Sequence, residues 1–129
     1  MKNLDQISME AGFRLADETC NILLNDKSKT ETILTKSLGV LQEQGLYACI
    51  LFCKSRPDSE NKAGKAIESV AKSILKDKLE LIQGDCKDLL AVLREEGGLS
   101  SNLDDLMLAV QVLEKALIYG RYHAKAIEK

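Results

Sequence analysis

A chain of 129 residues is long enough to form one domain with a sizeable hydrophobic core. Hydrophobic residues make up 45% of it, but no apolar stretch approaches the roughly 20 residues of a membrane-spanning helix, and none has the form of a signal sequence. The formal net charge of -2 excludes a uniformly basic protein that coats nucleic acid, so any nucleic-acid surface must be local. We therefore expect a single cytoplasmic domain over residues 1–129.

The composition favours helices over strands. One proline, eight glycines and no tryptophan provide little of the turn chemistry that an all-β fold requires. Apolar residues recur instead at helical spacing along most of the chain. We predict an all-α fold, a single compact bundle of about six helices.

Capping residues and glycine mark the ends of the first two predicted helices. The first begins after Asn3, a good N-cap, and continues to about Leu24. After a polar turn, Ser28 or Thr30 begins the second. Gly45 predicts the end of this helix, because glycine readily takes the left-handed conformation in which many helices terminate.

The eight residues after Gly45 carry no charge: Leu46-Tyr47-Ala48-Cys49-Ile50-Leu51-Phe52-Cys53. They predict a third helix near the centre of the bundle, buried on nearly all sides. It must stop before Pro57, because the residue before a proline avoids helical geometry. If Leu51 is buried there, its truncation to alanine would cost about 2–5 kcal/mol.

Three further helices complete the predicted bundle. The fourth runs from about Ser59 to Lys76 and the fifth from about Asp85 to Glu96, while 78–83 form either a short turn or an extension of a neighbouring helix. The last begins after Asn102 and carries an apolar seam about 40 Å long at 1.5 Å per residue. The seam consists of Leu103, Leu106, Val110, Leu113, Leu117, Gly120, Ala124 and Ile127. Such a seam is typical of a core helix, and also of a helix whose end pairs with another subunit.

Residues that could carry catalysis or bind a metal are few. His123 is the only histidine, and we interpret it as a partly exposed packing residue. The four cysteines are Cys20, Cys49, Cys53 and Cys86. They form no CxxC pair, which favours reduced thiols over a zinc site or disulfides. Gly97-Gly98 lacks the lysine and the preceding strand of a phosphate-binding loop. We expect no enzymatic activity, no catalytic residue, no metal and no cofactor.

Positive charge is concentrated in one segment. Between Lys54 and Lys78, seven basic residues accompany four acids. At about 100° per residue, four lysines of the fourth helix fall within an arc of about 80°, opposite its apolar residues. We call Lys62, Lys65, Lys72 and Lys76 the lysine ridge. A ridge of this kind suits a phosphate backbone, and it is also typical of an ordinary solvent-facing helix. The predicted RNA-binding residues are Lys54, Arg56, Lys62, Lys65, Lys72 and Lys76.

Three segments of the chain resemble one protein family. They are Leu4-Asp5-Gln6 with Ala11, then Leu38 to Lys54 with Gln44-Gly45-Leu46 and Cys53-Lys54-Ser55, and finally Leu108-Ala109 to Leu113 with Lys115 and Ala116-Leu117. In this order and spacing they are similar to the small helical subunit of the type III-B CRISPR effector, the Cmr RNA-silencing complex. Gln44 stands where the family's central segment has asparagine.

The resemblance implies a non-catalytic protein of antiviral defence. Members of this family stack as several copies beside the guide-bearing backbone subunits and line the channel where target RNA pairs with the CRISPR RNA. The implied partners are the other subunits of this ribonucleoprotein and the guide or target RNA backbone, with no membrane. We expect the isolated chain to be monomeric or weakly self-associating. Two alternatives remain: the small subunit of the type III-A complex, and a small helical adaptor or regulator that binds another protein through the last helix and never touches RNA.

Overall fold

The structure is a computed structural model that describes residues 3–82, 88–94 and 102–126. Within these ranges every regular element is helical, so the predicted all-α bundle is confirmed. The elements are α1 (Leu4–Ile22), α2 (Lys27–Gln44), α3 (Leu46–Lys54), α4 (Asp58–Ser73), the π-helical turn η1 (Ile74–Lys78), α5 (Leu89–Arg94) and α6 (Leu103–Ala126). The predictions made for Cys86, for Gly97-Gly98, for Ile127 and for helix ends at Asp85 and Glu96 lie outside the described residues.

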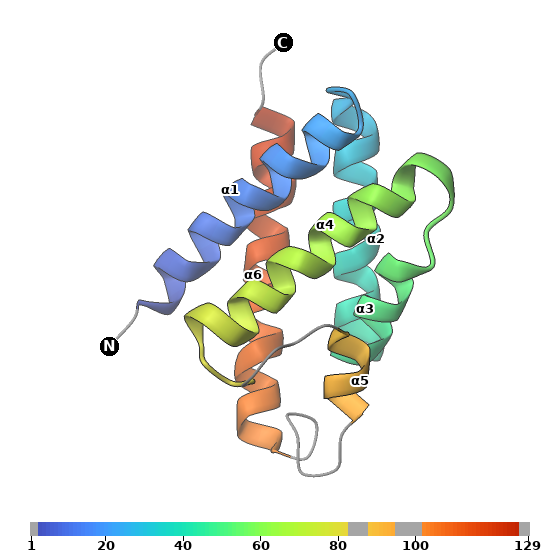
Figure 1. The fold of residues 1–129 in the computed structure, drawn as a ribbon. Coiled ribbons are helices and arrows are strands. Elements are labelled where there is room, and N and C mark those ends of the chain that lie inside the picture. Colours follow the sequence, from blue (N-terminus) through green and yellow to red (C-terminus); the bar gives the residue numbers. More distant parts are fainter. Residues whose placement is uncertain (1–2, 83–87, 95–101, 127–129) are drawn as a thin grey trace.

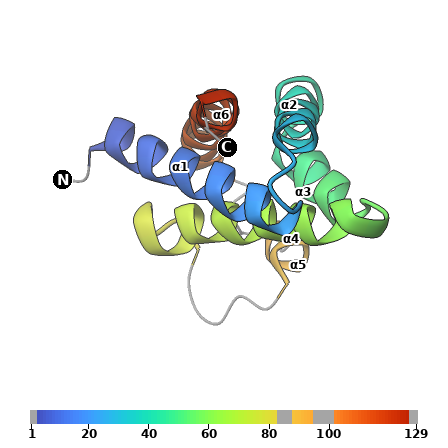
Figure 2. The ribbon, with the colours of Figure 1, turned by 90° about the horizontal axis from the view of Figure 1, so that it is seen from above.

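Five helices form a closed ring around the core. Helix α2 packs on α6, α6 on α1, α1 on α4, α4 on α3, and α3 on α2 (Figure 1). Seen from above, α2 and α6 lie on one side of the molecule and α4 on the opposite side (Figure 2). The short helix α5 packs against α3. None of the described helices is long and apolar enough to cross a membrane.

Side-chain caps set where α1 and α2 begin. The Asn3 side chain accepts hydrogen bonds from two backbone N–H groups of the first turn of α1, as predicted. Helix α2 begins at Lys27, earlier than the predicted start at Ser28 or Thr30. The reason is Asp26, whose carboxylate accepts a backbone N–H of the first turn and so caps the helix one position further back.

Gly45 separates α2 from α3, as predicted, through a backbone conformation that other residues rarely adopt. Its φ is 94° and its ψ is -176°, which lies in an extended region almost restricted to glycine instead of the left-handed helical region. Its N–H donates to the Leu41 carbonyl at 3.0 Å and so satisfies one of the last carbonyls of α2. An added Cβ would meet nothing within 4 Å, so the backbone alone imposes the glycine.

Helix α3 is buried on one face only, so the prediction that it is buried on nearly all sides is wrong. Its buried residues are Leu46, Cys49, Ile50 and Cys53. The side chain of Leu51 is 48% exposed. Helix α3 lies in the wall of the ring, between α2 and α4, and therefore keeps an outer face. A run of uncharged residues is found both in a helix enclosed on all sides and in a helix that lies in the wall of a bundle with an apolar outer face. The sequence alone therefore does not separate these two positions.

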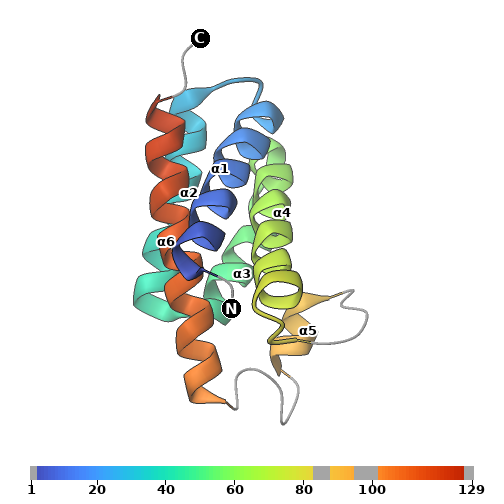
Figure 3. The same ribbon diagram turned by 90° about the vertical axis from the view of Figure 1, so that its left-hand side faces the viewer.

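Helix α6 is a core helix from Ala109 onward. Leu113, Leu117 and Ala124 of the predicted seam are buried, which confirms the seam as a core contact there. At the other end, Leu103 is 67% exposed and Met107 is 51% exposed. Figure 3 shows that the first turns of α6 extend past the beginning of α1. The core interpretation therefore holds for only part of the helix.

Two close helix contacts require glycine because a β-carbon would collide with the partner helix. At the crossing of α1 and α6, a Cβ on Gly12 would lie 2.5 Å from the Cβ of Tyr119, closer than real Cβ contacts allow. A Cβ on Gly64 of α4 would overlap the carbonyl oxygen of Cys53 in α3. The separations of these helix pairs are therefore set by the missing side chains.

A polar clamp joins the beginning of α1 to α6. Asp5 Oδ1 accepts a hydrogen bond from the Tyr119 hydroxyl at 2.7 Å and pairs with Lys115 Nζ at 2.9 Å. The hydrogen bond from Lys115, and then that from Tyr119, lower the pKa of Asp5. The carboxylate in turn raises the pKa of Lys115 and of Tyr119. At neutral pH the carboxylate is therefore charged while both of its partners keep the protons that they donate.

Because α3 is buried on one face only, alanine substitutions at two adjacent positions should lower the stability by different amounts. Ile50 is fully buried, whereas Leu51 is half exposed. Ile50→Ala should reduce the free energy of unfolding by about 2–5 kcal/mol, and Leu51→Ala by about 1 kcal/mol or less. Urea unfolding of both variants measures the difference. Equal losses would contradict the orientation of α3.

Replacing glycine with alanine should have opposite effects on stability at positions 64 and 39. Gly64→Ala should destabilise the protein by about 1–3 kcal/mol, because the new methyl group forces α4 away from the Cys53 carbonyl. Gly39 lies within α2 with nothing within 4 Å of an added Cβ, so Gly39→Ala should stabilise it by about 0.5–1 kcal/mol. Chemical denaturation of the two variants checks both signs, and a neutral Gly64→Ala would refute the close contact.

The Asp5 clamp predicts a stability difference that depends on pH. Because the pKa of Asp5 is lowered on folding, its contribution is present above the ordinary value of 3.8 and is lost as the pH falls through the lower folded value. Asp5→Asn should therefore lower the unfolding temperature at pH 7, with the difference from the parent shrinking below pH 3.8. Asp17→Asn, at an exposed position of the same helix, is the control. A difference that does not change with pH would argue against the clamp.

Candidate nucleic-acid interface

Helix α4 is amphipathic, and its packing decides which face meets solvent. Its buried residues are Ala63, Gly64, Ala66, Ile67, Val70 and Ala71. They lie on the side that packs against α1 and α3. The opposite side of the helix is directed away from the bundle, at the outer edge that Figure 2 shows for α4. The lysine ridge predicted from sequence belongs to this outer side.

The four ridge lysines are free to bind a ligand. Lys62 and Lys65 are exposed, whereas Lys72 and Lys76 are partly buried. Among the residues that the structure describes, none of the four forms an ion pair or a side-chain hydrogen bond. From Lys62 to Lys72 the α-helical part of the ridge extends about 15 Å at 1.5 Å per residue. Ser69, which lies on the same side of α4, is also exposed.

The α-helical phase of the ridge ends at Ser73, three residues before the predicted end at Lys76. The backbone continues as the π-helical turn η1, in which the Leu79 N–H donates to the Ile74 carbonyl at 2.8 Å. A π-type turn closes over five residues instead of four, so the angular step assumed from sequence does not apply there. Lys62, Lys65 and Lys72 therefore keep the predicted alignment, while the direction of Lys76 is set by η1.

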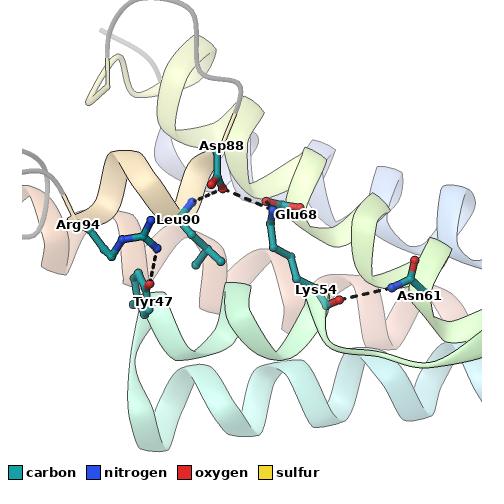
Figure 4. Close-up of polar contacts among 7 residues, drawn as sticks. All are labelled: Tyr47, Lys54, Asn61, Glu68, Asp88, Leu90 and Arg94. Carbon is teal, nitrogen blue, oxygen red and sulfur yellow. Dashed lines mark hydrogen bonds and ion pairs between the residues drawn. The ribbon is translucent and has the colours of Figure 1, made fainter.

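Lys54 is close to α4 but is already paired with acids. Its Nζ lies 3.6 Å from Glu68 Oε2 and 3.4 Å from Asp88 Oδ1 (Figure 4). The charge of Glu68, followed by that of Asp88, raises the pKa of Lys54. Burial alone would raise the pKa of Asp88, but the charge and hydrogen bond of Lys54, together with the Leu90 N–H and Arg94, lower it. The structure thus separates Lys54 from the free lysines of the ridge.

Arg56 is also held by contacts within the protein. Its guanidinium carbon lies 3.8 Å from the centre of the Phe52 ring, and its Nε donates to the Phe52 carbonyl at 3.1 Å. The Arg56 carbonyl accepts a hydrogen bond from the Asn61 amide at 2.9 Å. These contacts fix the connection between α3 and α4, so that Arg56 has a structural role at the end of the ridge in addition to its charge.

His123 and the three described cysteines contact other side chains of the protein. His123 is exposed and lies edge-on to Phe13, with ring centroids 5.8 Å apart. Cys20, Cys49 and Cys53 are buried, unpaired thiols. The hydrogen bond with Cys53 and burial both raise the pKa of Cys49, which keeps this thiol protonated. Within the described part of the chain, no group of three or more His, Cys, Asp or Glu residues could hold a metal ion.

A groove of about 150 Å³ lies between α1 and the end of α4, beside the ridge. Its lining residues are Ile7, Glu10, Ala11, Arg14, Val70, Ser73, Ile74, Asp77 and Lys78. Arg14 reaches across it to donate to the Ser73 hydroxyl at 3.4 Å and also pairs with Glu18. Two basic and two acidic side chains line the groove, so it does not extend the positive surface of the ridge.

Sequence reasoning missed the acids that neutralise Lys54. Glu68 and Asp88 lie 14 and 34 positions further along the chain, and no motif or helical spacing links either of them to Lys54. Only the packing of α4 and α5 against α3 brings the three side chains together. The same holds for Asp5, Lys115 and Tyr119 in the clamp between α1 and α6.

No protein-family model, curated protein or solved structure matches the chain.

Proposed function

We propose that this chain is a non-catalytic small subunit of a type III-B CRISPR effector, the Cmr complex, and that it helps to hold target RNA against the guide. The observation that carries the proposal is the row of three unpaired lysines on the outer face of α4, Lys62, Lys65 and Lys72, which Lys76 of η1 follows. The segments that resemble the family's small subunit lie in α1, in α2 with α3, and in α6. These helices form the rest of the ring, which leaves the outer face of α4 available for RNA.

The ridge is suited to a phosphate backbone. Lysine ammonium groups act as mobile point charges, so they can bind successive phosphates without reading the bases. A guide-bearing complex needs contacts of this kind, because base pairing already supplies the sequence specificity. Each lysine that neutralises a phosphate also releases condensed counterions, which makes the binding weaker at higher salt concentration.

Tight packing gives the ridge a fixed support. Helix α4 is held by α1 on one side and by α3 on the other. Gly64 brings α4 onto the end of α3, and Asn61 donates to the Arg56 carbonyl in the connection between them. The lysine side chains can move, but the helix that carries them keeps one orientation. The ridge would therefore meet the RNA of the assembled complex in a constant register.

One observation favours a second candidate, an adaptor that binds another protein through α6. Leu103 and Met107 are exposed in the first turns of this helix, which extend past the beginning of α1 (Figure 3). Exposed apolar side chains on one projecting helix are typical of a protein-binding surface.

The small subunit of a type III-A complex would use the ridge in the same way as that of a type III-B complex.

The proposal predicts how loss of the ridge alters RNA binding. Replacing Lys62, Lys65, Lys72 and Lys76 with alanine should weaken target-RNA binding of the assembled complex about equally for all sequences. The slope of log affinity against log salt should flatten by up to about one unit per lost contact. Fluorescence titration of labelled RNA at several salt concentrations measures both effects, and circular dichroism checks that the variant folds.

A charge-matched control separates the ridge from general electrostatics. It replaces Lys27, Lys29, Lys36 and Lys125 with alanine, which removes the same charge from α2 and from the end of α6. This control should retain most of the affinity and the parent slope. An unchanged slope in the ridge variant, with assembly intact, would reduce the ridge to an ordinary solvated face. Loss of assembly with normal RNA binding by the remaining complexes would favour the adaptor.

A further inference from the structure

Three helices meet at Lys54, beside the ridge. Lys54 is the last residue of α3, Glu68 belongs to α4, and Asp88 immediately precedes α5. Figure 4 shows the Lys54 side chain reaching the carboxylates of both acids. One ammonium group thus faces two carboxylates, so the cluster carries a net negative charge. Glu68 lies one helical turn before Lys72, which places this negative charge at the flank of the lysine ridge.

The carboxylates of Glu68 and Asp88 differ in how exposed they are and in how firmly they are held beside Lys54. The side chain of Glu68 is 17% exposed and projects from the middle of α4, whereas that of Asp88 is 50% exposed. The Asp88 oxygen that contacts Lys54 also accepts the Leu90 N–H at 3.2 Å, so the lysine shares it with the backbone of α5. An ion pair this exposed contributes little stability. Asp88 is therefore the partner that another anion could replace.

Helix α5 has other attachments that would keep it in place. Leu89, Leu90 and Leu93 are buried. Arg94 Nη1 donates to the Tyr47 hydroxyl at 2.7 Å, at the opposite end of α5 from Asp88 (Figure 4). The Leu90 N–H bond of Asp88 does not involve Lys54. Separation of Asp88 from Lys54 would therefore leave α5 docked on α3.

We propose that Asp88 is an intramolecular competitor for RNA at Lys54. Its carboxylate occupies the position that a backbone phosphate would take, and RNA bound along the ridge displaces it. The inference rests on the proposed function of the ridge, to which it adds a further phosphate contact and a limit on affinity. RNA held only weakly would not displace Asp88, whereas RNA fixed in register by pairing with the guide would present a phosphate to Lys54 continuously.

A double-mutant cycle tests this competition. In the assembled complex, Asp88→Asn should raise affinity for target RNA about two- to fivefold, the range expected for one exposed ion pair. The asparagine oxygen can still accept the Leu90 N–H, so α5 keeps its cap. Lys54→Ala alone should change affinity little, and in the double variant it should abolish the gain.

Asp58→Asn is the matched control for charge. Asp58 is exposed at the start of α4, lines a groove with Lys29 and Lys36 of α2, and makes no ion pair within the described residues. Any gain from this variant should persist when Lys54 is replaced by alanine. Acetylation of the RNA-free protein gives a second readout: Asp88→Asn should increase the reactivity of the Lys54 amine and leave that of Lys62 unchanged. Asp88→Ser, which can also accept the Leu90 N–H, repeats the test if the asparagine variant folds poorly.

The outcomes separate this inference from the proposed function. If the ridge variant loses RNA binding but Asp88→Asn changes nothing, or its gain persists without Lys54, the competition is refuted and the function stands. If the ridge variant binds RNA as the parent does, the proposed function fails, and the competition fails with it. A gain that depends on Lys54, together with loss of binding in the ridge variant, supports both.

Discussion

The contact between α4 and the end of α3 determines what this protein presents to its surroundings. Gly64 lets α4 approach the Cys53 carbonyl more closely than any other residue would allow. At this separation Ile67 and Val70 are buried, and the ridge lysines are left on the outer side. A side chain at position 64 would force α4 to shift or rotate. The apolar core and the charged surface thus depend on the same missing methyl group.

Some of the cations of this protein are neutralised by acids and others are not. Lys54, Lys115 and Lys125 each pair with at least one carboxylate. The four ridge lysines have no such partner among the described residues, although the whole chain has a formal net charge of -2. Lys27, Lys29 and Lys36 of α2 also form no ion pair within these residues, so what distinguishes the ridge is the alignment of its lysines and not their lack of partners. The acids around Lys54 set the boundary of the basic face.

Much of the fold could be predicted because its signals are local. The Asn3 cap, the glycine at position 45 and the helical spacing of apolar residues each act within a few residues. The alignment of Lys62, Lys65 and Lys72 follows from helical geometry alone. The solvent exposure of a side chain, in contrast, depends on where other helices lie. The outer face of Leu51 depends on where α3 lies in the ring, and no spacing reveals it.

The remaining parts of the site arise from tertiary contacts. Nothing in the sequence distinguishes Lys54, which meets two acids, from Lys62, which meets none. The π-helical turn was also missed, because residues 74–78 have ordinary helical spacing and the wider turn appears only in the backbone hydrogen bonds. The sequence could therefore predict a basic helix face but not which of its cations are free.

Amine footprinting of the assembled complex tests the central claim most directly. The lysines would be acetylated with and without target RNA, and the modified positions identified by mass spectrometry. The account predicts that RNA protects Lys62, Lys65 and Lys72, while Lys29 and Lys36 on α2 react equally in both states. Ridge lysines that stay as reactive with RNA as without it would contradict the account.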